Sequence, residues 1–150
     1  MNTKYNMIDP HLINKLNEYL DIIEASTGPA IVVTIGSGVK VFCSGFNLME
    51  TVRLKHNRVL MPMNMLDVMS RFLTLNVPTL CVVNGHAVAG GLYLAMCHDY
   101  VIANSNPKIK IFLNESLIGL GFYQSYVSLL NALVSNRLAR SLHLGDNYNP

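Results

Sequence analysis

The sequence is poor in charged residues, and this shortage excludes several classes of protein. Charged residues make up 13% of the 150 residues, hydrophobic residues make up 51%, and the formal net charge is only +2. No basic run alternates with aromatic residues, so we do not expect a nucleic-acid-binding protein. A chain this apolar is not disordered, and its length suits one domain spanning residues 1–150.

Cysteine is also scarce. The three cysteines, Cys43, Cys81 and Cys97, are scattered and form neither a CxxC pair nor a Cys/His cluster. This spacing predicts no disulfide framework and no metal site, and it fits a reducing, intracellular compartment. No apolar run reaches the roughly 18 residues of a membrane span, and the N-terminus has no signal-peptide pattern. We therefore expect an intracellular protein without a membrane span.

Several common catalytic motifs are missing as well. The stretch "IGSGVK", residues 35–40, has the spacing of neither a Walker loop nor GxGxxG, and a hairpin turn is the better interpretation. Ser44 has a glycine on one side only, which argues against a serine hydrolase. His86 and His98 have no carboxylate at metal-motif spacing, so we expect each to be a surface or hydrogen-bonded histidine.

The residues that are present alternate between strand and helix patterns. Asp9 and Pro10 predict a helix start, and apolar residues at helical spacing extend that helix to about residue 26. The β-branched run at 30–35 predicts a strand buried on both faces. Further strands are expected at 41–43, 79–83, 100–103 and 109–113, further helices at 60–75, 90–97 and 123–143, and turns in the final "GDNYNP". This alternation predicts an α/β fold with mostly parallel pairing.

One carboxylate stands out in the apolar stretch "IFLNESLIGLGF", residues 111–122. Glu115 lies among side chains that favour burial, and an unpaired buried carboxylate is costly and has a raised pKa. It is either tied to a structural partner or tuned as an acid/base. Asp99, at the end of an apolar helix, is more simply expected to accept local backbone hydrogen bonds.

Two glycine-bearing turns are candidates for binding an oxyanion. Gly90 and Gly91 follow a strand and open a helix, where backbone N–H groups are unpaired. Ser44 and Gly45 form a similar turn after another strand. Together the turns would aim two donors at one oxygen, although small residues also serve simply to let a helix and a strand pack closely.

Three segments in order carry a family resemblance: "VFCSGFNL" (41–48), "PTLCVVNGHAVAGGLYLAMCHDYVIAN" (78–104) and "IFLNESLIGLGF" (111–122). They resemble the crotonase, or enoyl-CoA hydratase/isomerase, superfamily. The resemblance implies the ββα spiral of that family. The spiral is expected to be incomplete, because the N-terminal strand pair and C-terminal helical region usual in the family have no counterpart in these 150 residues.

The resemblance also implies residue roles. The N–H groups of Ser44 and Gly90 would hold the thioester oxygen of an acyl-CoA as an enolate, and Glu115 would be the acid/base. Asn47 stands where many members carry an aspartate. The neighbouring positions implied to bind substrate are Phe42, Gly45, Phe46, Asn47, Leu48, Gly91, Tyr93 and Phe122. No metal or redox cofactor is expected, because coenzyme A is part of the substrate.

Tyr93 favours one reaction within the family. Hydratases carry a second glutamate at this position, where a carboxylate pair orients water, whereas double-bond migration needs one proton shuttle. We therefore expect an isomerase of fatty-acid β-oxidation that moves a C3 double bond to C2. Two alternatives stay open: a non-catalytic remnant that binds acyl-CoA or a partner, and an enoyl-CoA hydratase. The family implies a homo-oligomer, usually a trimer, and a peroxisomal or mitochondrial location, although the sequence shows no targeting signal.

Overall fold

The computed structural model describes residues 5–146. The helices are α1 (Pro10–Glu24), α2 (Leu48–Arg53), α3 (Asn57–Thr74), α4 (Gly90–Met96), α5 (Gln124–Leu133) and α6 (Asn136–His143), with a 3-10 turn η1 at Ser116–Ile118. The strands are β1 (Val32–Ile35), β2 (Val41–Cys43), β3 (Thr79–Val83), β4 (His86–Val88), β5 (Tyr100–Ala103) and β6 (Ile111–Phe112).

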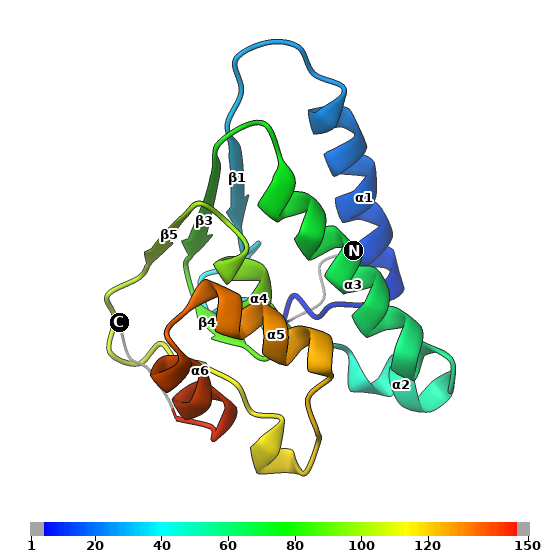
Figure 1. The fold of residues 1–150 in the computed structure, drawn as a ribbon, viewed down its shortest axis with the longest axis vertical. Coiled ribbons are helices and arrows are strands. Elements are labelled where there is room, and N and C mark those ends of the chain that lie inside the picture. The colour runs from blue at the N-terminus through cyan, green and yellow to red at the C-terminus, as the bar shows by residue number, and fades with distance from the viewer. Residues whose placement is uncertain (1–4, 147–150) are drawn as a thin grey trace.

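The strands form two three-stranded parallel sheets, with the orders β1-β3-β5 and β2-β4-β6. Each turn of the chain therefore adds one strand to each sheet before a helix returns it, which is a ββα spiral (Figure 1). The hairpin predicted at residues 35–40 is wrong, because β1 pairs with β3 and β2 pairs with β4. This segment instead carries the chain from one sheet to the other.

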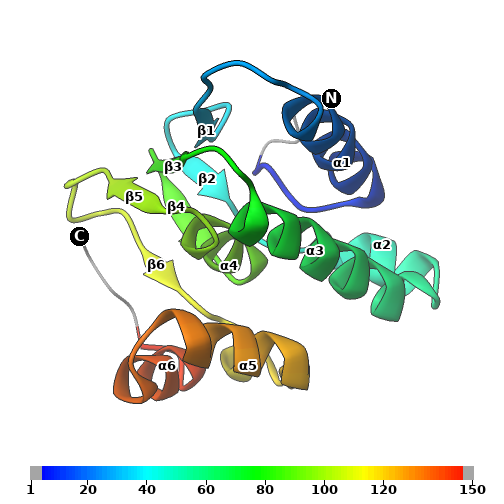
Figure 2. The same ribbon diagram turned by 45° about the horizontal axis from the view of Figure 1, so that its top comes forward.

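Helices α1 and α3 lie side by side and cover the spiral (Figures 1 and 2). Helix α1 begins as predicted: the Asp9 carboxylate accepts a hydrogen bond from the Leu12 amide at 2.8 Å, and Pro10 occupies the first turn. Helix α3 buries Met61, Met65 and Met69, so the methionines on this helix fill the core. It begins three residues before the predicted range.

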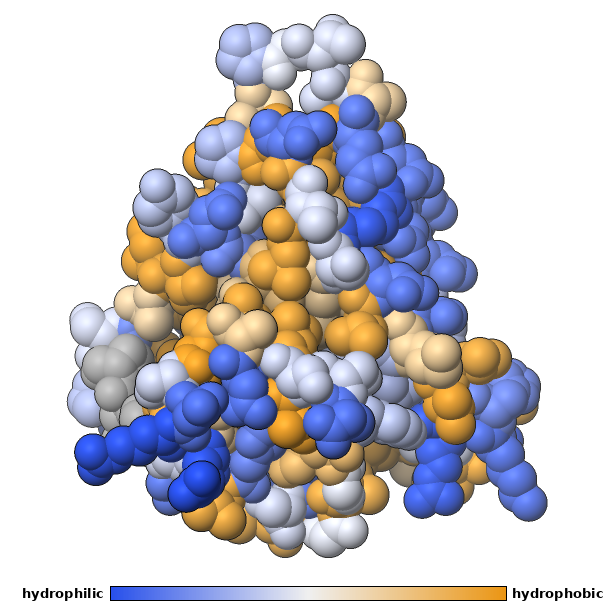
Figure 3. All heavy atoms as spheres, in the orientation of Figure 1, coloured by the Kyte–Doolittle hydropathy of each residue, from blue (hydrophilic) through white to orange (hydrophobic). Residues whose placement is uncertain are grey.

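One prediction about burial fails in β1. Val33 and Ile35 are 52% and 58% exposed, so one face of the β1-β3-β5 sheet is open in this chain and the strand is not buried on both faces. Tyr100 and Ile102 on β5 are also exposed. In Figure 3, hydrophobic residues (orange) accordingly reach the surface over β5 and at the centre of the view. The outer edge formed by α1 is hydrophilic (blue).

Other differences concern the ends of elements. The helix predicted at 123–143 is two helices, because the chain is extended at Val134 and Ser135 and the Ser135 hydroxyl caps α6 by accepting from the Leu138 amide. The short elements α2 and β4 were not predicted. In the closing "GDNYNP", Gly145 has a φ of 90° and turns the chain, and the last four residues lie outside the described part.

His98 and Asp99 join α4 to the sheet. His98 is buried and its ring nitrogens lie 2.8 Å from the Thr34 hydroxyl and 3.0 Å from the Leu94 carbonyl oxygen, as expected of a hydrogen-bonded histidine. The Asp99 carboxylate accepts from the amide and hydroxyl of Thr79 at 2.8 and 2.9 Å. The main partner of Asp99 is therefore not local as predicted, since Thr79 lies twenty residues away on β3, and the hydrogen bond from the Asp99 amide itself has a smaller effect on its pKa. These bonds lower the pKa of Asp99.

Candidate active site

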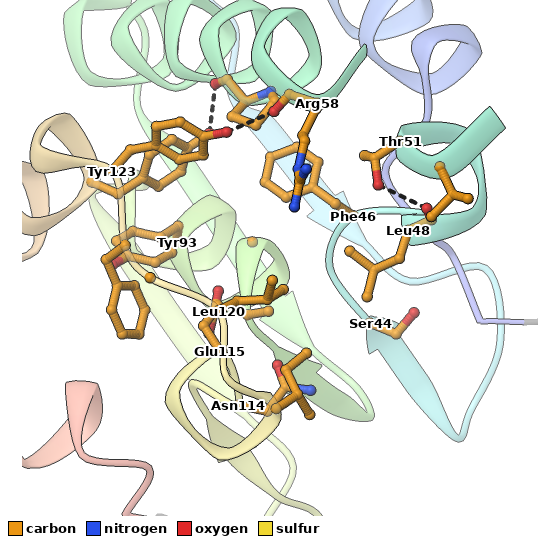
Figure 4. A pocket seen from close by; sticks show the side chains of 18 of the residues that line it. Ser44, Phe46, Leu48, Thr51, Arg58, Tyr93, Asn114, Glu115, Leu120 and Tyr123 are labelled. Carbon is orange, nitrogen blue, oxygen red and sulfur yellow. Dashed lines mark hydrogen bonds between the residues drawn. The ribbon is translucent and has the colours of Figure 1, made fainter. Parts of the chain in front are cut away.

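A cavity of about 840 Å³ opens between the glycine turns, α2, α3, α5 and the segment after β6 (Figure 4). Its wall is largely apolar and aromatic. Glu115 is the one carboxylate among the described residues that line it. The residues that line it include Ser44, Phe46, Leu48, Lys55, Arg58, Gly90, Tyr93, Glu115, Phe122 and Tyr126.

The turn before α4 lines this cavity through Ala89 and Gly90. Ala89 has a φ of 54°, a conformation that costs a residue with a Cβ atom about 1–3 kcal/mol and is typical of functional sites. Its amide donates to the Phe112 carbonyl oxygen at 3.0 Å, and its own carbonyl accepts from the amides of Leu92 and Tyr93. The amide of the next residue, Gly90, donates to no acceptor within residues 5–146.

The second turn meets the first at Gly45. Gly45 has a φ of 83°, and a Cβ atom added there would lie 2.8 Å from the Ala89 Cβ and 3.2 Å from the Gly90 nitrogen. A Cβ added at Gly90 would in turn lie 3.3 Å from the Phe46 ring. The two turns are therefore in direct contact, and only glycine fits at Gly45. That the two turns aim their N–H groups at one oxygen stays a prediction.

The Ser44 amide is not available to hold a substrate oxygen. It donates to the carbonyl oxygen of Tyr5 at 3.2 Å, and the Asn47 amide donates to Ile8 at 2.8 Å, because residues 5–8 pair alongside this turn. The Gly45 amide faces the Cys43 thiol. The prediction for Ser44 therefore needs correction: of the amides from 44 to 47, that of Phe46 alone has no acceptor in the described part of the chain.

Glu115 lies in the cavity wall, at the end of the segment that follows β6. Its carbonyl oxygen accepts from the Leu120 amide at 2.8 Å and the Ile118 amide at 3.2 Å, so a tight turn fixes its backbone. Its Oε2 atom is buried and has no hydrogen-bond partner among the described residues. Burial raises the pKa of Glu115, with a smaller opposing effect of backbone hydrogen bonds. Of the two roles considered for this carboxylate, this environment favours the acid/base over the structural partner.

Tyr93 forms the wall next to Glu115. Its side chain is 1% exposed, and its hydroxyl lies 3.3 Å from His143 Nε2 on α6. Burial raises the pKa of Tyr93, and the charge of Glu115 adds to this effect. The ring meets Tyr126 edge to face, with centroids 5.0 Å apart. Tyr93 is thus a neutral aromatic wall residue.

The remaining predicted substrate positions divide into two groups. Phe46, Leu48 and Phe122 line the cavity with Tyr93. Phe42, Gly45, Asn47 and Gly91 do not line it. Phe42 is a buried core residue, and the Asn47 side chain caps α2 by accepting from the Met49 amide at 3.2 Å. Gly91 is buried against Cys43, so its role is close packing of α4 on β2.

Two cations, Lys55 and Arg58, and two further tyrosines, Tyr123 and Tyr126, line the cavity and were not predicted. Lys55 and Arg58 come from the connection into α3 and from its first turn, and Figure 4 shows the Arg58 side chain extending toward the cavity. The basic run "RLKHNR" at 53–58 was the available signal. Tyr126 enters from α5 and donates to the Pro62 carbonyl oxygen at 2.7 Å, a contact no local pattern reveals. In the described residues no cluster of three potential ligands is placed to hold a metal, and no helix has the length and apolarity to cross a membrane.

Comparison with known proteins identifies the family. The model of the family "Enoyl-CoA hydratase/isomerase" matches residues 1–150. The chain belongs to the enoyl-CoA hydratase/isomerase family. Among curated relatives, enoyl-CoA delta isomerase 3 of Arabidopsis thaliana is 32% identical over 119 residues, covering 77% of this chain and 49% of the relative. The mitochondrial enoyl-CoA delta isomerase 1 of Mus musculus is 36% identical over 91 residues, covering 58% of this chain and 30% of the relative.

Solved structures of this family share the fold. An enoyl-CoA hydratase from Mycobacterium ulcerans matches with a TM-score of 0.89 at 22% identity, covering 98% of this chain and 64% of that one. A family member from Pseudomonas syringae matches with a TM-score of 0.87 at 26% identity, covering 99% of this chain and 64% of that one. The predicted α/β spiral is thus confirmed. The chain spans about half the length of the curated isomerases it matches, at 49% and 50% of the first two.

Proposed function

We propose that this protein is an isomerase that moves a C3 double bond to C2 in an unsaturated acyl-CoA. The observation that carries the proposal is the buried Oε2 atom of Glu115, which has no hydrogen-bond partner among the described residues and lies in the same cavity wall as the acceptor-free amide of Gly90. An enolate needs both groups, a base for the carbon acid and donors for the developing oxyanion.

In the proposed reaction, the Glu115 carboxylate removes a proton from C2 of the 3-enoyl thioester. The electron pair of the broken C–H bond forms a dienolate, whose oxygen accepts hydrogen bonds from the Gly90 and Phe46 amides. The protonated Glu115 then gives the proton to C4, the double bond settles between C2 and C3, and the carboxylate is regenerated. Protons and electrons balance without metal or redox cofactor, since the thioester is the electron sink.

Lys55 and Arg58 support the choice of an acyl-CoA. They bring two positive charges to the cavity wall, and neither forms an ion pair within residues 5–146. We assign them to the phosphate groups of coenzyme A, because lysine and arginine are the usual phosphate partners. The apolar and aromatic remainder of the wall suits an acyl chain.

The direct test is turnover of a 3-enoyl-CoA by the wild-type protein and by E115Q. We expect conversion to the conjugated 2-enoyl thioester, and a loss of about 10²–10⁴-fold in kcat in the variant, the usual contribution of a general base. Calorimetric titration with a saturated acyl-CoA should show binding by both proteins. Equal turnover by wild type and E115Q would refute the role of Glu115.

Acyl-CoA binding without turnover is the second candidate function. It is favoured by the open apolar face of β1 and β5, which leaves part of the sheet surface free for a partner. Tight binding with no conversion by a folded wild-type protein would establish it in place of isomerisation. Hydration is disfavoured by the absence of a second carboxylate from the described lining.

The relatives also suggest a compartment and an assembly. Curated delta isomerases are named as peroxisomal in Arabidopsis thaliana and mitochondrial in Mus musculus. We propose one of these two organelles for this protein, which microscopy of the tagged full chain tests. A homo-oligomer such as a trimer is proposed by family resemblance, and sedimentation of the purified chain measures it.

A further inference from the structure

Helix α6 reaches the candidate site through one side chain, His143. This histidine lies at the end of α6, fifty residues from Tyr93 in sequence, and its Nε2 is 3.3 Å from the Tyr93 hydroxyl. Its ring also packs edge to face on Phe122, with centroids 4.5 Å apart. Because Tyr93 and Phe122 both line the cavity, His143 contacts two parts of its wall from behind.

The direction of the Tyr93–His143 bond follows from the other contact of the imidazole. The His143 ring faces the Ala139 carbonyl, one turn back on α6, and a carbonyl can only accept. Since Nε2 lies beside Tyr93, the nitrogen on the Ala139 side is Nδ1, and a proton on Nδ1 leaves Nε2 of the neutral ring as an acceptor. Burial lowers the pKa of His143 and so favours that neutral form. The Tyr93 hydroxyl then donates to Nε2.

This bond engages the polar end of Tyr93 with α6. In Figure 4 the Tyr93 ring lies in the wall beside Glu115, among the aromatic side chains of the cavity. With its hydroxyl engaged by α6, Tyr93 has no free donor with which to orient a water molecule near the carboxylate. A wall fixed in this way excludes water from the carbon that a hydratase would attack.

We infer that His143 is a positioning residue that holds Tyr93 as a water-excluding wall beside Glu115, and so restricts the site to proton transfer. The inference rests on the proposed isomerase function and adds a determinant of reaction specificity. The competing reaction is addition of water across C2=C3 of the 2-enoyl product, with hydroxyl bound at C3 and a proton at C2. Water is its only co-reactant.

The test compares His143→Leu, which removes the acceptor, with His143→Gln, whose side-chain oxygen still accepts from Tyr93. His11→Leu, on the exposed surface of α1, is the matched control for losing a histidine. Each variant is given 3-enoyl-CoA, and the ratio of 3-hydroxyacyl-CoA to 2-enoyl-CoA is measured. In H143L we expect this ratio to rise roughly 3- to 10-fold, the change expected on losing one hydrogen bond. H143Q should restore it toward the wild-type value.

A double-mutant cycle separates positioning from general loosening. Tyr93→Phe removes the same bond from the other side, so Y93F and H143L should raise the ratio by similar factors, and the double variant should add little. The inference would be overturned if the changes in product ratio caused by Y93F and H143L simply multiply in the double variant. It would also be overturned if folded H143L gives the wild-type product ratio.

A second readout does not depend on turnover. The infrared band of the protonated Glu115 carboxyl, identified by its absence in E115Q, gives the pKa of that group directly. Entry of water in H143L should move this pKa back toward that of an ordinary glutamate, while H11L should not change it. If the wild-type protein does not isomerise 3-enoyl-CoA, the proposed function is refuted, but the role of His143 in excluding water is not. An unmoved carboxyl pKa in H143L would refute the water-excluding wall even if isomerisation is found.

Discussion

The close contact at Gly91 gives a prediction whose size follows from the structure. A Cβ atom at Gly91 would lie 2.4 Å from the Cys43 carbonyl oxygen and 2.8 Å from the Cys43 Cβ. Both atoms belong to the β2 backbone or are bonded directly to it, so Gly91→Ala forces α4 and β2 apart. Overpacking of this kind typically destabilises a fold by about 1–3 kcal/mol, and we expect a value at the upper end of this range. The better helix propensity of alanine offsets up to about 1 kcal/mol of this.

The net destabilisation of Gly91→Ala is about 2 kcal/mol, which for a chain of this size lowers Tm by roughly 4–8 °C. Thermal melts followed by far-UV circular dichroism measure it. Gly90→Ala is the matched control, because its Cβ would meet only the ends of side chains, at 3.0 Å from Ile8 Cδ1 and 3.3 Å from the Phe46 ring. We expect G90A to melt near wild type but to lose about 10²–10³-fold in kcat, as when an oxyanion donor is displaced. An unchanged melting temperature for G91A would refute the packing argument.

Two further predictions concern charge. Burial makes native Glu115 hold its proton more tightly than in the unfolded chain, so between the ordinary glutamate pKa of 4.5 and the raised native pKa the native state binds more protons and stability falls as pH rises. Chemical denaturation across this range should show a falling difference between wild type and E115Q, and a flat difference would contradict the burial of Glu115. Separately, Arg71 on α3 bridges Asp21 and Glu24 on α1, with Nη2 at 2.6 and 2.9 Å from their oxygens. Because the site is solvent-accessible, R71M should cost about 1 kcal/mol or less, and a loss that persists unchanged in high salt would contradict an ionic origin.

Much of the fold could be predicted because its longer elements carry their own patterns. The capping Asp9 with Pro10 marks the start of α1, and the β-branched and apolar runs predicted β3 and β5 with their observed bounds. The short elements α2 and β4 were missed, since three to six residues are too few to show a period. The exposure of Val33 and Ile35 was also missed, because a β-branched run looks the same whether or not another layer covers it.

The candidate site was predicted at the level of turns and side chains, and less well at the level of single amides. Glu115, Gly90 and Tyr93 were recognised and share one cavity. Whether Ser44 or Phe46 offers a free N–H depends on residues 5–8, which take up the Ser44 amide through a tertiary contact. His143 was missed for the same reason, since its contact with Tyr93 spans fifty residues.

The most direct test of the central claim, a single shielded carboxyl that carries one proton from C2 to C4, is isotope transfer. A 3-enoyl-CoA deuterated at C2 is converted by the wild-type protein, and the 2-enoyl product is examined for deuterium at C4 by NMR or mass spectrometry. Because the Oε2 atom of Glu115 is buried and exchanges its proton slowly with solvent, we predict that part of the label arrives at C4. A C4 hydrogen drawn entirely from solvent would contradict the account.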